Sequence, residues 1–210
     1  VDVDAYFPSI RHDLLLALLA RRFKGAGFLD LLGRIVARGC SSGVPGCGLP
    51  IGALTSQHFA NAFLDSADRL LLDLPGTGAH VRYMDDIFWG CASRAVAEDS
   101  LALLATHLET GWGLRLKAGS RIARSAEGAR YCGFRVRQGV VLPSSRKMHR
   151  FRAAMARIEQ AQFAGLADEG QIQRAADTGL ATLAGCQSLD FRRRVLVAGV
   201  YSEGSGCPST

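Results

Sequence analysis

The chain has 210 residues, 48% of them hydrophobic, so it can bury a core as one domain or as a large domain with an appendage. Its formal net charge of +6 favours a polyanionic partner such as nucleic acid, although an excess of arginine over lysine can also reflect coding bias. The longest apolar run in a predicted helix, residues 14–20, is too short to cross a membrane, so we expect no membrane contact.

The six cysteines are not arranged as a metal site or a disulfide framework. No two of them have the C-x-x-C spacing that is typical of zinc sites. Cys40 and Cys47 flank a Gly/Ser-rich loop and can approach each other, but a pair of incidental thiols is the simpler interpretation. We therefore expect a reducing, cytoplasmic environment.

The chain opens with a predicted strand. Residues 1–7 alternate in polarity, which places Asp2 and Asp4 on one face of the strand. A helix is expected to begin after Pro8 and to end before Gly25, where cations precede a glycine. A short helix over residues 29–36, a flexible loop over 39–48 and a turn that opens a helix over 49–57 are predicted next.

Residues 81–89 predict a β-hairpin with two adjacent acids, Asp85 and Asp86, at its turn. Aspartate is a common turn residue, so this pair does not by itself require a function. Two adjacent carboxylates repel each other, however, unless a cation lies between them, and Mg²⁺ or Mn²⁺ suits a set of oxygen ligands. A third carboxylate on a neighbouring strand would favour a metal site, and Asp2 is the candidate.

The elements that follow complete an α+β order. A helix is predicted from Arg94 to about Glu109, strands over residues 114–117 and 121–123, and a hairpin from residues 130–137 and 140–142. We therefore predict an α+β fold in which helices cover one face of a mostly antiparallel sheet.

After Pro143 the chain becomes basic and helical. Three helices are predicted, over residues 144–163, 171–183 and 191–197. The first carries charges of almost one sign, which favours a surface that follows a phosphate backbone over a merely solvated face. We assign to this surface Arg146, Lys147, Arg150 and Arg152.

Four segments, in this order, resemble the motifs of reverse transcriptases. Residues 2–7 resemble the motif in which a catalytic aspartate precedes an aromatic residue by five positions, and residues 49–57 resemble the helix-opening motif that follows it. Tyr83-Met84-Asp85-Asp86 is similar to the Y-x-D-D motif. Residues 128–136, centred on Cys132, Gly133 and Phe134, resemble the primer-grip hairpin, and the likeness extends to about residue 197.

This resemblance implies a domain organisation. Residues 1–142 would be a polymerase palm, residues 143–200 a small helical thumb, and residues 201–210 a flexible tail. The family also has a fingers region before its first catalytic aspartate, and that region is absent from this sequence. The chain therefore resembles a fragment, and its activity without fingers stays an open question.

The helix-opening motif resembles one subfamily in particular. Ile51-Gly52-x-x-x-Ser56-Gln57 is similar to the variant found in diversity-generating retroelements, whereas group II intron and retron enzymes have proline after the serine. The resemblance implies error-prone synthesis of cDNA from a template RNA and primer, with dNTPs as substrates and a small accessory RNA-binding protein as partner. The alternatives are a group II intron or retron-type enzyme, and a catalytically silent palm that binds nucleic acid; a viral RNA polymerase is disfavoured because it would have glycine in place of Met84.

The family also implies a role for each site residue. Asp2 and Asp85 would bridge two Mg²⁺ ions, with Mn²⁺ as a substitute, while Asp86 would be an auxiliary ligand and the Val3 carbonyl would bind the metal on the triphosphate side. Phe7 would pack under the sugar and exclude a 2′-hydroxyl, although it also fits a core position.

The remaining predicted contacts concern the nucleotide. Gly52, Ser56 and Gln57 would line the templating base and the incoming dNTP, together with Tyr83 and Met84. Lys117 is the candidate proton donor to pyrophosphate, with Arg121 or neither residue as the alternatives.

Overall fold

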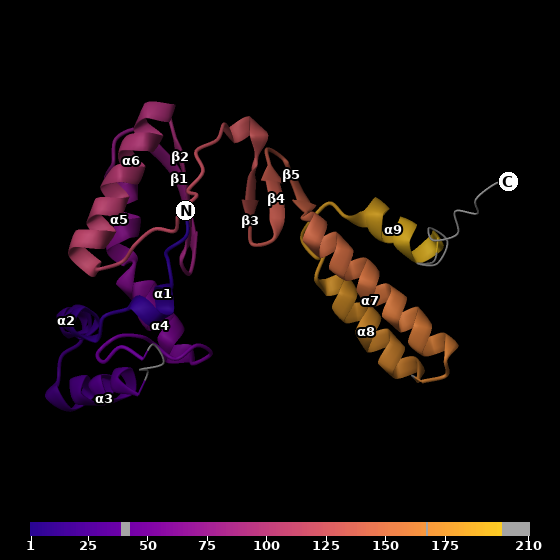
Figure 1. The fold of residues 1–210 in the computed structure, drawn as a ribbon, viewed down its shortest axis with the longest axis horizontal. Coiled ribbons are helices and arrows are strands. Elements are labelled where there is room, and N and C mark those ends of the chain that lie inside the picture. The colour runs from indigo at the N-terminus through magenta and orange to yellow at the C-terminus, as the bar shows by residue number, and fades with distance from the viewer. Residues whose placement is uncertain (39–42, 167, 199–210) are drawn as a thin grey trace. The chain divides into compact units, whose positions relative to one another are not determined.

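The computed structural model describes residues 1–38, 43–166 and 168–198, which form a mixed α+β chain with small antiparallel sheets (Figure 1). This confirms the predicted α+β class. Cys40 and the predicted tail over residues 201–210 lie outside the described residues. The chain divides into two compact units, residues 1–122 and 123–210, and each is described by itself. No helix within the described ranges is long and apolar enough to span a membrane.

The first unit contains six α-helices in its described part, interrupted by one hairpin. The hairpin consists of β1 (Thr77–Tyr83) and β2 (Asp86–Cys91), and α6 ends in a π-helical turn, η1 (Leu108–Trp112). The helices are α1 (Tyr6–Ser9), α2 (His12–Arg22), α3 (Ala26–Ala37), α4 (Leu54–Phe63), α5 (Asp65–Asp73) and α6 (Arg94–His107).

The predicted first strand is shorter than expected. Only Asp2 and Val3 form β-bridges, because Asp4 and the left-handed Ala5 (φ 42°) make a turn and residues 6–9 then form α1. This turn buries the Tyr6 ring, and its hydroxyl donates a hydrogen bond to the Ala60 carbonyl of α4. The prediction of a strand as far as Phe7 was therefore wrong, since a polar/apolar alternation of seven residues does not reveal a left-handed turn inside it.

The N-terminal segment widens the β1–β2 hairpin. Asp2 pairs with Asp86 on one side, and Val3 pairs with Leu116 on the other, in both cases antiparallel. The Ile87 amide donates to the Val1 carbonyl at 2.8 Å, and the Lys117 amide donates to the Asp2 carbonyl at 2.8 Å. The segment thus lies between β2 and residues 115–117. The predicted strand over residues 121–123 is absent, because a three-residue alternation specifies no pairing partner.

Helices cover the inner face of this hairpin. α5 and α6 pack against it, and the core they share includes Ile87 of β2 and Leu104 of α6, both fully buried. Val3 is buried in the same core, so the chain that carries Asp2 is anchored immediately after the carboxylate. Burial of an aliphatic side chain of this size stabilises the fold by about 1.5–3 kcal/mol.

The second unit consists of a three-stranded antiparallel meander and three helices in its described part. The strands are β3 (Ala129–Tyr131), β4 (Phe134–Arg137) and β5 (Val140–Pro143), preceded by a 3₁₀ turn, η2 (Ser125–Glu127). The helices α7 (Ser145–Phe163), α8 (Glu169–Ala181) and α9 (Leu189–Ala198) confirm the helices predicted after Pro143. Their shared core consists of Phe151, Met155, Leu183 and Val195.

Candidate active site

Acids that are far apart in the sequence lie on adjacent strands of the first unit. Asp2 is in backbone register with Asp86, and the Val3 amide donates to the Asp85 carbonyl at 3.3 Å. The charge of Asp2 is near enough to the Asp85 carboxyl group to disfavour its ionisation. The hairpin and the N-terminal segment therefore bring together the carboxylates that we predicted to act together.

The surroundings of Asp85 disfavour the ionisation of its carboxyl group. Burial raises the pKa of Asp85 above its usual range, and the neighbouring charge of Asp2 raises it further, whereas Lys117 acts in the opposite direction. Across residues 1–38, 43–166 and 168–198, no group of three or more His, Cys, Asp or Glu side chains is arranged to hold a metal ion. The described cluster is thus a pair of carboxylates with Asp86 beside it in the sheet.

Lys117 supplies the positive charge at this pair. Its Nζ donates to both carboxylate oxygens of Asp2, at 2.9 and 2.8 Å, and both side chains are about half exposed. The hydrogen bond and the charge of Asp2 raise the pKa of Lys117, so the amine stays protonated. The residue predicted as a proton donor is therefore placed as a counter-ion of the first carboxylate.

The turn between β1 and β2 contains a residue in an unfavourable backbone conformation. Met84 lies in the left-handed region, with φ of 56°. For a residue with a side chain this conformation costs about 1 kcal/mol or more, and it persists only where the surroundings impose it.

Arg82 provides that support. Its Nη1 donates to the Met84 carbonyl and to Asn61 Oδ1, both at 3.0 Å, while Nη2 donates to Asp68 Oδ2 at 2.6 Å. The Arg82 and Asp68 side chains are only 11% and 19% exposed, so this ion pair is largely removed from water. Arg82 therefore ties the turn that carries Asp85 to α4 and α5.

Sequence reasoning missed Arg82 and Asp68. A signal was present, because strand alternation places Arg82 opposite the buried Ile87, on the inner face of the hairpin. A charged residue on an inward face requires a partner, but the sequence does not show that the partner is Asp68, one helix away.

The predicted nucleotide-binding residues differ in exposure. Phe7 is half-buried, packs edge-on against Tyr6 and accepts a backbone hydrogen bond from Leu49, at the start of the helix-opening motif. Ser56 is buried in the first turn of α4, whereas Gly52 and Gln57 are exposed. Gly52 has φ of 95° and open space around it, as a close approach of a ligand to the backbone would require.

Tyr83 lies at the turn end of the hairpin. It is paired with Asp86 and is 64% exposed, on the face of the hairpin opposite Ile87. Val81 and Phe88, which pair with each other one step along the ladder on this face, are also exposed. The predicted site thus borders a sheet face with three exposed apolar or aromatic side chains.

The predicted primer-grip residues lie in the second unit. Cys132 and Gly133, both with positive φ, form the two-residue turn between β3 and β4, which is the geometry that a tight hairpin requires. Lys147 lies 3.6 Å from the centre of the Phe134 ring, and its Nζ donates to the Thr182 carbonyl at 3.4 Å. Lys147 therefore stabilises the hairpin, whereas Arg146, Arg150 and Arg152 are exposed on α7.

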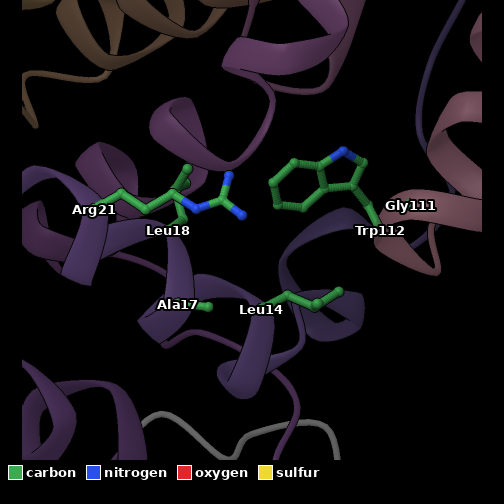
Figure 2. A pocket seen from close by; sticks show the side chains of 6 residues that line it. All are labelled: Leu14, Ala17, Leu18, Arg21, Gly111 and Trp112. Atoms are coloured by element: carbon green, nitrogen blue, oxygen red, sulfur yellow. The ribbon is translucent and has the colours of Figure 1, made fainter.

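A small pocket lies elsewhere in the first unit, between α2 and η1 (Figure 2). Its volume is about 170 Å³, and the Arg21 side chain is directed toward the Trp112 indole across it. None of the predicted site residues lines it. The lining residues are Leu14, Ala17, Leu18, Arg21, Gly111 and Trp112.

Comparison with known proteins adds no family assignment, because no protein-family model matches the chain and no curated protein matches it either.

The support that Arg82 gives to the turn can be measured. Arg82→Met leaves Asp68, inside the protein, with only the His80 ring as a partner, whose Nε2 lies 3.2 Å from Asp68 Oδ1, so we expect the free energy of unfolding to fall by about 2–4 kcal/mol. Both tryptophans, Trp89 and Trp112, belong to the first unit, so urea unfolding followed by their fluorescence reports on this unit. Arg94→Met, which breaks the exposed pair with Glu98, is the matched control and should change little. Equal losses in the two variants would show that Arg82 has no special role.

The raised pKa of Asp85 gives a second expectation. A carboxyl group whose pKa is raised by folding binds its proton more tightly in the native state, so its ionisation lowers stability as the pH rises. Asp85→Asn should therefore stabilise the first unit at neutral pH, and the gain should disappear as the pH falls toward the ordinary value of about 4. Unfolding followed by tryptophan fluorescence from about pH 4 to pH 8 measures this. A loss of stability at neutral pH would contradict it.

Proposed function

We propose that this protein is the palm and thumb of an RNA-directed DNA polymerase, which copies a template RNA into cDNA from a primer and dNTPs. The observation that carries the proposal is the pairing of Asp2 with Asp86, and of the Val3 amide with the Asp85 carbonyl, at a hairpin turn that reads Tyr-Met-Asp-Asp. A chance turn aspartate does not require a second carboxylate on the adjacent strand. Gln57 favours the error-prone enzymes of diversity-generating retroelements within this class.

The donor set suits hard divalent cations. Asp2 and Asp85 offer oxygen atoms only, and their repulsion is the kind that such a cation relieves. Asp2 and Asp85 would hold two Mg²⁺ or Mn²⁺ ions, with Asp86 and the Val3 carbonyl as further ligands. When bound, two such ions supply neutralisation of charge on the attacking and the leaving oxygen atoms of a phosphoryl transfer.

The protein's own residues would position the carboxylates and supply a proton. In the reaction the 3′-oxygen of the primer forms a bond to the α-phosphorus of the dNTP, and the bond from that phosphorus to the pyrophosphate oxygen breaks. Arg82 keeps Asp85 in place through the Met84 carbonyl. Lys117, released from Asp2, would lie where it can give a proton to the departing pyrophosphate, while solvent takes the proton of the primer hydroxyl. Phe7 would pack under the sugar.

A second candidate is a palm without catalysis that binds nucleic acid. The observation in its favour is the Lys117 ion pair, which neutralises Asp2 without any metal ion. The two candidates make different predictions for synthesis but not for binding.

Primer extension on an RNA template with dNTPs and Mg²⁺ decides between them. The chain of residues 1–210 is assayed. Asp85→Asn should lower DNA synthesis by at least about a hundredfold, because it removes a metal-ligand charge. Asp99→Asn, an exposed acid on α6, is the matched control and should leave synthesis unchanged. Equal synthesis by both variants, or binding of RNA without synthesis under any metal, would contradict a polymerase; errors opposite template adenines would favour the retroelement type over the intron type.

Lys117 should compete with the metal for Asp2. Because the ion pair must open before a divalent cation can use both oxygens, Lys117→Gln should raise the affinity for Mn²⁺ about three- to tenfold. Titration followed by the electron paramagnetic resonance of free Mn²⁺ measures this without any reference to synthesis. Lys117→Arg keeps the charge and should behave like the parent protein. An unchanged or weaker affinity in Lys117→Gln would show that the Lys117–Asp2 ion pair does not compete with the metal ion for Asp2.

A further inference from the structure

The pocket between α2 and η1 is bounded on one side by a single stripe of α2. Leu14, Ala17, Leu18 and Arg21 follow the i, i+3, i+4, i+7 spacing of one helix face. None of the four is fully buried, since the two leucines are half-buried and the other two residues are exposed. The pocket therefore has an aliphatic floor that ends in a cation.

Trp112 of η1 forms the opposite wall, and the protein holds its indole in place. The ring packs edge-on against Phe63, with the ring centroids 4.6 Å apart. Its Nε1 donates a hydrogen bond to His107 Nε2 at 3.3 Å, and Ser66 Oγ lies 2.9 Å from the same nitrogen. An aromatic wall that is fixed in this way needs no rearrangement to receive a ligand, which lowers the cost of binding.

Arg21 supplies a positive charge that the protein does not use itself. In the described part of the chain its guanidinium forms no ion pair and no hydrogen bond. The neighbouring Arg22 pairs with Asp65 at 3.4 Å, and Glu109 of η1 pairs with Arg115 at 3.4 Å. The Arg21 side chain is instead directed across the pocket toward the indole (Figure 2). Because these acids are already paired and a guanidinium is always charged, the pocket favours an anionic ligand.

The size of the pocket limits the ligand to one ring with a short substituent. Its volume is about 170 Å³, and an apolar cavity of roughly 150 Å³ holds a molecule of benzene. A flat ring can pack against the indole, while a carboxylate accepts two parallel hydrogen bonds from a guanidinium group. A single carboxylate also matches the single cation, whereas a phosphate dianion would keep uncompensated charge beside an apolar surface.

We propose that the pocket between α2 and η1 binds a small aromatic carboxylate, with its ring between the leucines of α2 and Trp112 and its carboxylate on Arg21. No residue assigned to the polymerase reaction lines this pocket, so the inference goes beyond the proposed function and does not rest on it. A free acid and a phenylalanine at the end of a peptide chain both offer this chemistry. Inorganic phosphate is the competing ligand.

The test uses the full chain and proton–nitrogen correlation NMR, in which the two tryptophans give two indole N–H signals. Trp112→Phe identifies the signal from the pocket, and Trp89, which donates to Ser100 Oγ, is the internal control. The pH is held constant because His107 is hydrogen-bonded to the reporting indole.

Phenylacetate should shift the Trp112 signal, with saturation at millimolar concentrations as is typical of so small a ligand, and should leave the Trp89 signal in place. Phenylacetamide has the same ring without the charge. It should bind at least about tenfold more weakly, because it cannot form the charge-assisted hydrogen bonds to Arg21.

Substitutions in α2 separate the contribution of the charge from that of the space. Arg21→Gln should weaken phenylacetate binding at least about tenfold and leave phenylacetamide binding unchanged. Ala17→Phe places a ring in the pocket from an exposed position, so it should abolish the binding of both probes. Arg22→Gln removes the same charge from an exposed ion pair one residue away, and this matched control should keep the parent affinity. An unchanged Trp89 signal verifies that each variant is folded.

Three results would overturn the inference. They are equal affinities for the acid and the amide, equal binding by Arg21→Gln and Arg22→Gln, and shifts of both tryptophan signals without saturation. Inorganic phosphate that shifts the Trp112 signal at lower concentrations than phenylacetate would overturn it too, because the pocket would then select an anion and not an aromatic ring.

The two sources of the ligand are separated by a short peptide that ends in phenylalanine. Tighter binding of this peptide than of phenylacetate, lost when its terminus is amidated, supports the inference with a protein terminus as the ligand. Weaker binding of the peptide supports it with a free acid as the ligand. None of these measurements involves DNA synthesis, so failure of the pocket and failure of the polymerase are observed independently.

Discussion

The repulsion between Asp2 and Asp85 is the constraint on which the first unit depends. Two neighbouring carboxylates, one of them with its pKa raised by burial, are unfavourable in a folded chain that contains no compensating charge. The protein meets this constraint from two sides. Lys117 places a positive charge next to Asp2. Arg82 donates a hydrogen bond to the Met84 carbonyl and so keeps the turn, and with it Asp85, close to Asp2. A fold that had only to be stable would place apolar or neutral residues here.

The elements that a local pattern can specify were predicted well. The hairpin with acids at its turn, the helix opened by residues 49–57, and the basic helix after Pro143 all follow from periodicity and turn chemistry. The expectation that Asp2 would approach the hairpin came from the resemblance of spaced motifs and was supported by the bridge to Asp86. What the sequence alone could not reveal depends on non-local contacts: the left-handed turn at Ala5, the clamp from Arg82 to Asp68, and the ion pair of Lys117.

The two units differ in charge, a difference that the charge count of the whole sequence does not show. Residues 1–122 balance their charges and hold the carboxylates, whereas residues 123–210 carry the excess of arginine on exposed surfaces. Lys147 shows why charge counting by itself misassigns residues, because its amine is used within the unit against Phe134 and Thr182. Register and burial separate a cation that holds the fold together from one that faces outward.

The π-helical turn at the end of α6 has a consequence for how this protein can change over time. In η1 the chain contains one residue more per turn than an α-helix would, after which Leu114 returns its amide to Leu108 and the next residues run beside the N-terminal segment. Because side chains alternate along an extended segment, loss of a single residue from this turn would send Lys117 to the opposite face, away from Asp2. We therefore expect an insertion or deletion in η1 to disturb the Lys117–Asp2 pair more than a substitution at one of its exposed positions, because the length of η1 decides which face Lys117 occupies.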